Sequence, residues 1–189
     1  MKKLFLFTVL FTIAALSFAQ ERETEKSASE AVRFEKSVGS LIKKDFYNLE
    51  DAENFYKIDV LILTNVLSGA KVGCLRWENR YKADYMSSSY IPYIGTLDFD
   101  ELDAAIQSLT YIRDTLLPTV PDNYTEVVFE SKDGMMLGAY FDNKENEWTI
   151  FVRTKAYPQD STRHFGNKFL PKMIDMLTTA KTKIQELTK

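Results

Sequence analysis

Four carboxylates crowd a short stretch of this sequence, GTLDFDELDAAIQSL, at residues 95–109. They are Asp98, Asp100, Glu101 and Asp103. Carboxylates at this density are able to ligate a divalent cation, to act as a catalytic acid–base pair, or to begin a helix. The three roles need different surroundings, so the neighbouring residues help to decide between them.

The spacing gives little support to the cation or the catalytic role. A calcium loop of the EF-hand type needs an oxygen ligand at its fifth position, glycine at the sixth and glutamate at the twelfth. Counting from Asp98, these positions hold Leu102, Asp103 and Leu109, so the pattern fails. A catalytic pair needs two acids that face one cleft and differ in pKa, and the sequence leaves that role open.

A helix start accounts for more of these residues. Asp98 is a favourable N-cap residue, and Glu101 three positions later completes a capping-box pattern. Leu97 and Leu102 stand where a hydrophobic staple forms. The apolar residues that follow have helical spacing, and they are Leu102, Ile106, Leu109, Ile112 and Leu116. We interpret the acids as a helix start, which does not determine whether Asp103 faces solvent or a cleft.

One cysteine and one histidine limit the remaining chemistry. Cys74 lies in the apolar stretch VGCLRW, which predicts a buried thiol and permits no intrachain disulfide. A single His164 excludes histidine-rich zinc sites and two-histidine iron sites, and its polar neighbours indicate an exposed loop or strand end. Met135 and Met136 would point to opposite faces of a strand, so they are not expected to share one ion. We expect no metal and no cofactor.

Aromatic side chains supply the candidate binding residues. The segment NRYKADYMSSSYIPYIG contains Tyr81, Tyr85, Tyr90 and Tyr93 among serines. Exposed tyrosines beside polar residues stack on sugars or hold peptides. The alternative is structural, with Tyr90 and Tyr93 packed on a sheet and Tyr81 at the end of a strand.

Basic residues near two expected strand ends form a further candidate: Arg76, Arg80 and Lys82, with Arg153, Lys155 and Arg163. Together they would line a groove for an anion or a single nucleic-acid strand. Cations along strand edges also protect against aggregation, and we favour that role. The formal net charge is −3, so bulk charge gives no reason to expect nucleic acid as a partner.

The N-terminal residues indicate export. Residues 1–19 have a basic start, an apolar run of about a dozen residues and a small-residue cleavage site, which is typical of a signal peptide. We therefore expect a periplasmic or extracellular protein, with residues 20–29 as a flexible leader and 30–189 as one domain. Removing Lys2 and Lys3 leaves 22 basic against 27 acidic residues, a net charge of −5.

The remaining pattern predicts an α+β fold with a mostly antiparallel sheet and two long helices. Strands are expected at 39–49, 56–64, 71–80 and 90–97, the second central and the last at an edge because it contains Pro92. A helix follows at 99–117. Further strands are expected at 125–130, 135–142 and 148–153, with a type I′ turn at Asp133 and Gly134. A polar loop at 156–167 and a helix at 168–187 complete the chain. Strands followed by a helix thus occur twice, in pseudo-halves 39–117 and 124–189.

Two resemblances follow from these features. The repeated order of strands and helix resembles the Whirly and PC4-like single-stranded DNA-binding architecture, although the lysine-glycine-lysine strand motif of Whirly proteins is absent. The signal peptide ending FAQ, the LDFDELDAAIQSL helix start and the SKDGMMLGAYF hairpin resemble small uncharacterised exported proteins of Gram-negative gut bacteria. That second resemblance implies export and a domain of unknown function.

The sequence therefore favours a non-catalytic exported domain that binds a protein or a glycan. Its support is mainly the absence of nucleophile, metal and phosphate-loop patterns. An enzyme that uses carboxylates, such as a glycan hydrolase, is one alternative, and a Whirly-like single-strand binder is another.

Overall fold

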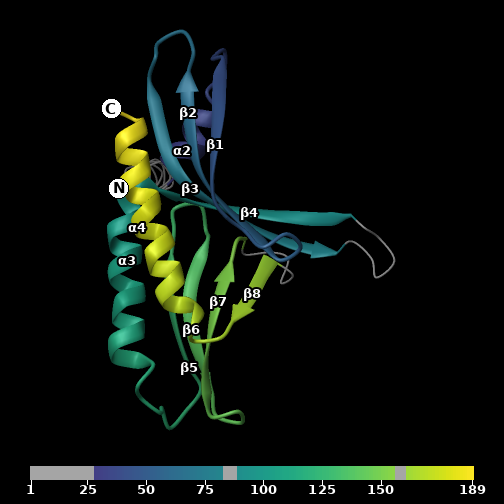
Figure 1. Cartoon of the computed structure of the whole chain (residues 1–189), viewed down its shortest axis with the longest axis vertical. Coiled ribbons are helices and arrows are strands. Elements are labelled where there is room, and N and C mark those ends of the chain that lie inside the picture. The colour runs from purple at the N-terminus through teal and green to yellow at the C-terminus, as the bar shows by residue number, and fades with distance from the viewer. Residues whose placement is uncertain (1–27, 83–88, 156–160) are drawn as a thin grey trace, which may run out of the picture.

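The computed structural model describes residues 28–82, 89–155 and 161–189. It contains two four-stranded antiparallel sheets, each followed by a helix (Figure 1). The first sheet comprises β1 (Ile42–Asp51), β2 (Tyr56–Asn65), β3 (Lys71–Lys82) and β4 (Tyr90–Asp98). The second comprises β5 (Thr125–Glu130), β6 (Met136–Asp142), β7 (Glu147–Arg153) and β8 (Thr162–Phe165). The long helices are α3 (Leu102–Tyr111) and α4 (Phe169–Leu187), and a short α2 (Glu30–Glu35) precedes β1.

Each sheet follows the order of its strands along the chain. The predictions that β2 is central and β4 an edge strand are confirmed, and Pro92 lies opposite Arg80 of β3. In the part of the chain that the structure describes, β5 and β8 are the edge strands of the second sheet. This arrangement confirms the α+β class and the repeat of strands followed by a helix.

One hydrophobic core joins both sheets and both long helices. Alternate residues of β2, among them Ile58 and Val60, are buried with Leu137 and Ala139 of β6. The predicted apolar stripe of α4 is buried in the same core. Gly73 lets α4 lie close to β3, because a Cβ atom there would stand 2.5 Å from Ile184 Cγ2. The two halves therefore share their packing.

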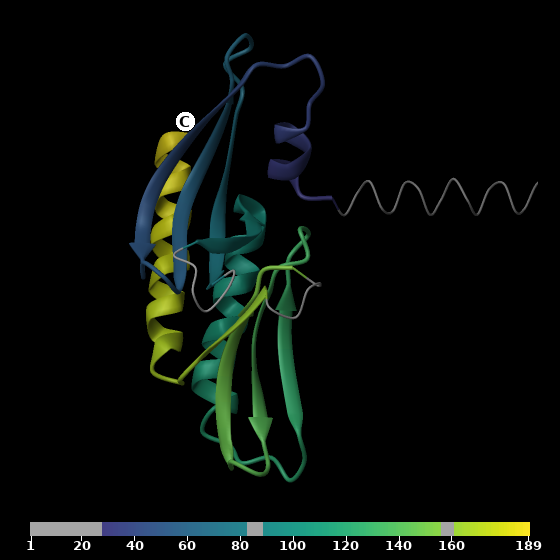
Figure 2. The ribbon, with the colours of Figure 1, turned by 90° about the vertical axis from the view of Figure 1, so that its right-hand side faces the viewer.

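A second, smaller cluster lies on the opposite face of the first sheet. Ala31 of α2 packs with Leu61, Leu63 and Cys74, and all four are buried. Figure 2 shows α2 and α4 on opposite sides of this sheet. The predicted burial of Cys74 is thus confirmed, and burial raises the pKa of its thiol to about 12.

The prediction of a type I′ turn at Asp133 and Gly134 is wrong. Such a turn needs a positive φ at both central residues, and only Gly134 has one, at 78°. Instead, Gly134 N donates to the Ser131 carbonyl at 2.8 Å, so Lys132 and Asp133 are the central pair. A tertiary contact accompanies this geometry, because Asp133 Oδ2 accepts hydrogen bonds from the backbone and side chain of Thr96.

Several boundaries also differ from expectation. The expected loop at 156–167 contains β8, whose four residues are too few to give a clear alternation, and 156–160 lie outside the described residues. The expected helix at 99–117 has three parts: a 3-10 turn (Phe99–Glu101), α3, and a π-helical turn (Ile112–Leu116). Over the described parts of the chain, the helices are all too short or too polar to cross a membrane.

Candidate functional site

The carboxylates of the acidic stretch at residues 95–109 are largely occupied by structural contacts. Asp98, Asp100 and Glu101 each bring one carboxylate oxygen within 4.8 Å of the others, close enough for a shared cation. However, Asp98 is buried, and it accepts hydrogen bonds from Ser29 Oγ at 2.8 Å and from the backbone N–H groups of Glu30 and Ala31. This carboxylate therefore ties the first turn of α2 to the end of β4.

The other acids of this stretch have partners of their own. Glu101 accepts hydrogen bonds from Asp98 N at 2.9 Å and Lys132 N at 2.7 Å, which confirms the capping box. Burial raises the pKa of Glu101 above its ordinary value, despite these two bonds. Asp100 pairs with Lys132 at 2.6 Å. Asp103, 76% exposed, faces solvent and pairs with Lys181 of α4, so it lies in no cleft.

The structure describes three of the four predicted binding tyrosines: Tyr81, Tyr90 and Tyr93, with Tyr85 outside the described residues. Tyr81 and Tyr93 contact each other edge to face, with ring centroids 5.9 Å apart. The guanidinium of Arg163 stands 3.8 Å from the Tyr81 ring centroid, and the Tyr81 hydroxyl donates to the Thr162 carbonyl. Tyr81 therefore joins β3 to β8, and a binding role for these tyrosines stays a prediction.

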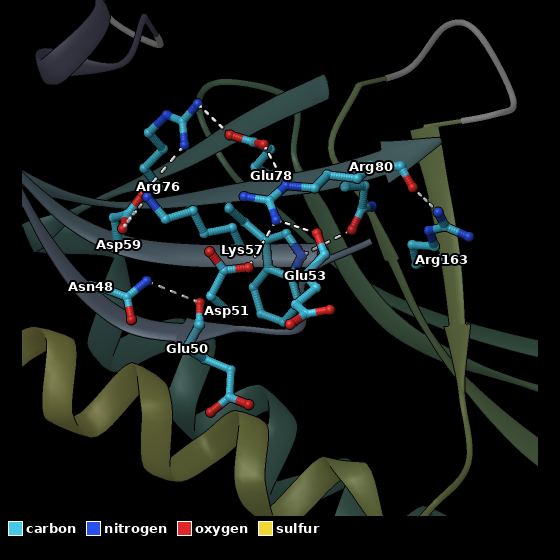
Figure 3. A network of polar contacts seen from close by, with 12 residues as sticks. Asn48, Glu50, Asp51, Glu53, Lys57, Asp59, Arg76, Glu78, Arg80 and Arg163 are labelled. Atoms are coloured by element: carbon cyan, nitrogen blue, oxygen red, sulfur yellow. Dashed lines mark hydrogen bonds and ion pairs between the residues drawn. The ribbon is translucent and has the colours of Figure 1, made fainter. Parts of the chain in front are cut away.

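The two basic sets do not form one bare cationic surface. Figure 3 shows that Arg76 and Arg80 lie among carboxylates on the outer face of the first sheet. Glu78 lies 2.8 Å from each of them, and Arg80 also pairs with Asp51 at 2.8 Å. Burial disfavours ionisation of Glu78, but the hydrogen bonds from Arg80 and Arg76 lower its pKa. These charges neutralise one another across β1 and β3.

A groove that the sequence did not predict lies between α3 and the free edge of β5. Its volume is about 420 Å³. One wall of the groove is formed by residues of α3 and of the π-helical turn that follows it. These residues are Ala104, Gln107, Ser108 and Tyr111 of α3, and Ile112 and Leu116 of the turn. The strand wall is residues 127–129 of β5. Two apolar side chains of this groove remain open to solvent, Tyr111 at 56% and Val128 at 45% exposure.

Glutamates stand on both sides of Val128 on the solvent-facing side of β5. The burial of β5 alternates along the strand, so Glu126, Val128 and Glu130 all face solvent. The sequence signal that could have indicated this groove is the alternating pattern TEVVFE. This pattern predicts a half-buried strand, but it does not show that the strand lies at the edge of its sheet. The position of α3 beside it depends on packing that no local pattern encodes.

No family model, curated protein or solved structure matches this chain. The resemblances to Whirly-like proteins and to small exported proteins therefore remain predictions.

Proposed function

We propose that this chain is an exported, non-catalytic module that binds an extended segment of a partner protein in the groove between α3 and β5. The observation that carries the proposal is a free strand edge beside an apolar groove. Because β5 pairs with β6 alone among the strands that the structure describes, half of its backbone N–H and C=O groups point away from the sheet. A peptide that adds a strand there would satisfy those groups.

The groove offers pockets for side chains on one face of such a peptide. Ala104 and Ser108 are small, which leaves room for the partner's residues between α3 and β5. The apolar surface of Tyr111 and Val128 would be removed from water on binding, at about 25 cal/mol for each Å² buried. A π-helical turn ends the helical wall, and such turns are frequent at functional sites.

Charge selects the kind of partner. Glu126 and Glu130 flank Val128 on the solvent side of β5, so a bound strand gains most where lysine or arginine stands opposite them. A second copy of this chain fits poorly. Antiparallel pairing of two β5 strands about Val128 would set Glu126 of one copy against Glu130 of the other, and like charges directly opposite destabilise a strand pair. The expected partner segment alternates apolar and basic residues.

Selection from a displayed library of random decapeptides tests this function. We expect enriched peptides to alternate apolar residues with lysine or arginine, and to slow hydrogen exchange of the β5 amides when bound. Val128→Lys should weaken their binding by about tenfold or more, since it removes an apolar contact and repels the basic peptide.

Val66→Lys is the matched control, because Val66 is 50% exposed at the β2–β3 connection, away from the groove. A double charge reversal, Glu126→Lys with Glu130→Lys, should switch the selection toward acidic peptides. Selected peptides that bind Val128→Lys as well as the parent chain, or that protect another segment from exchange, would contradict the proposal.

A further inference from the structure

A second hollow lies on the outer face of the first sheet, where α2 and the turn between β5 and β6 form its walls. Its volume is about 440 Å³, within the range of small-molecule pockets in proteins. It is remote in sequence from the groove, since it draws on α2 and all four strands of the first sheet.

The floor of this hollow is apolar and partly uncovered. Phe46 of β1, Leu61 of β2 and Ile94 of β4 line it, and Val32 of α2 contributes from one wall. Phe46 is 52% exposed on β1, an edge strand of the sheet, whereas Leu61 opposite it on β2 is buried. The guanidinium of Arg76 lies over this ring, 5.7 Å from its centroid, and the ring surface that stays exposed would gain from contact with an apolar ligand.

The rim of the hollow carries more positive than negative groups. Its four basic residues are Lys36, Lys44, Arg76 and Lys155, and its two acidic residues are Glu35 and Asp133. Arg76 is already paired with Glu78 and Asp59, so the local positive excess is carried by the three lysines. This local excess contrasts with the net charge of −3 for the whole chain. A ligand with negative charge therefore meets a more favourable field here than the overall charge suggests.

The lysines of the rim are able to reach a ligand. Among the described residues, Lys36 forms no ion pair with a carboxylate. Lys44 pairs with Glu35, but both side chains are at least 40% exposed, and exposed pairs of this kind contribute little to stability. Lys155 pairs with Asp133 at 3.1 Å and is similarly exposed. A ligand carboxylate would replace or share these partners at small cost.

We propose that this hollow binds a small organic anion with an apolar body, of the class of medium-chain carboxylates. The apolar body would cover Phe46, Leu61 and Ile94, and the carboxylate would accept hydrogen bonds from Lys36 and Lys44. A purely apolar ligand would leave the ammonium groups without a new partner, and an inorganic anion would leave Phe46 in water. A molecule with both an apolar body and a carboxylate contacts the apolar floor and the lysines of the rim at the same time.

Calorimetric titration of the folded chain with octanoate tests this site, with octanamide as the uncharged analogue of equal length. We expect octanoate to bind about tenfold more tightly than octanamide, because charge-assisted hydrogen bonds to the lysines are lost with the amide. The double variant Lys36→Gln with Lys44→Gln should remove most of this difference. Phe46→Ala should weaken both ligands.

Lys144→Gln, an exposed lysine on the connection between β6 and β7, is the control and should change neither affinity. All the substituted side chains are exposed, so unchanged unfolding midpoints will separate lost binding from lost folding. Equal affinity for octanoate and octanamide would overturn the anion part of the proposal. The absence of saturable octanoate binding at millimolar concentration, or binding that Phe46→Ala leaves unchanged, would overturn the site itself. Neither result depends on whether a peptide occupies the groove at β5.

Discussion

At the scale of single residues, Asp98 links two parts of the chain that are far apart in sequence. It stands at the N-cap of the 3-10 turn before α3, and its carboxylate oxygens accept hydrogen bonds from Ser29, Glu30 and Ala31. The sequence predicted the cap, because a capping box is a local pattern. It did not predict the contact with α2, because a six-residue helix has too few turns to show a periodic apolar face.

Replacement of Asp98 by alanine should lower the free energy of unfolding by about 3 kcal/mol, since hydrogen bonds to a buried charged group are worth roughly 1.5–3 kcal/mol each. Urea denaturation measures this loss. Asp100→Ala is the control: it removes an exposed ion pair with Lys132 and should cost less than about 1 kcal/mol. Similar losses in the two variants would contradict the structural role of Asp98. The structural role of Asp98 would also be contradicted if calcium raised the melting temperature of the parent chain substantially and had no such effect on Asp98→Ala.

At the scale of elements, β3 connects the two sheets through one buried amide. Asn79 is fully buried, and its Oδ1 accepts a hydrogen bond from Trp77 Nε1 at 3.0 Å. Its Nδ2 donates to the carbonyl groups of Val152 at 3.0 Å and Ser161 at 2.8 Å, both beyond the first sheet. Alternation of apolar residues predicted most strands and the buried face of each. It did not predict that the strands divide into two sheets, because a period of two identifies a face but not a neighbour.

Asn79→Ala should therefore destabilise the chain strongly, by about 3 kcal/mol or more, because it leaves one buried donor and two buried carbonyl groups without this partner. The change is measurable from the midpoint of urea unfolding at constant slope. Asn143→Ala removes a hydrogen bond of an exposed amide to the Asp122 carbonyl, and should cost less than about 1 kcal/mol. If Asn79→Ala costs no more than Asn143→Ala, the amide does not connect the sheets energetically.

At the scale of the whole molecule, the shared core holds two separate surfaces, the groove at β5 and the hollow beneath α2. Neither was predictable from the sequence, because each is made by elements from different parts of the chain. The predicted tyrosines were recognisable because they lie close together in sequence, whereas Tyr111 and Val128 of the groove are separated by 17 positions. Composition identified which residue types were available, and only tertiary packing decided which of them stayed exposed.

The position of Cys74 beneath α2 makes its thiol a built-in reporter of how often that helix detaches. The thiol is fully buried with a pKa raised to about 12, so a disulfide reagent cannot attack the closed form at neutral pH. Labelling must await an opening, and detachment of a six-residue helix needs far less free energy than global unfolding.

Ser29→Ala should therefore speed labelling at least about fivefold, because it removes an N-cap hydrogen bond worth about 1 kcal/mol and also the hydrogen bond from Ser29 to Asp98. The labelling rate should depend only weakly on urea, in contrast with global unfolding. A labelling rate that rises with urea as steeply as unfolding itself would mean that α2 opens only when the whole chain does. A labelling rate that depends only weakly on urea would mean that Cys74 reports the local detachment of α2, which uncovers one face of the first sheet.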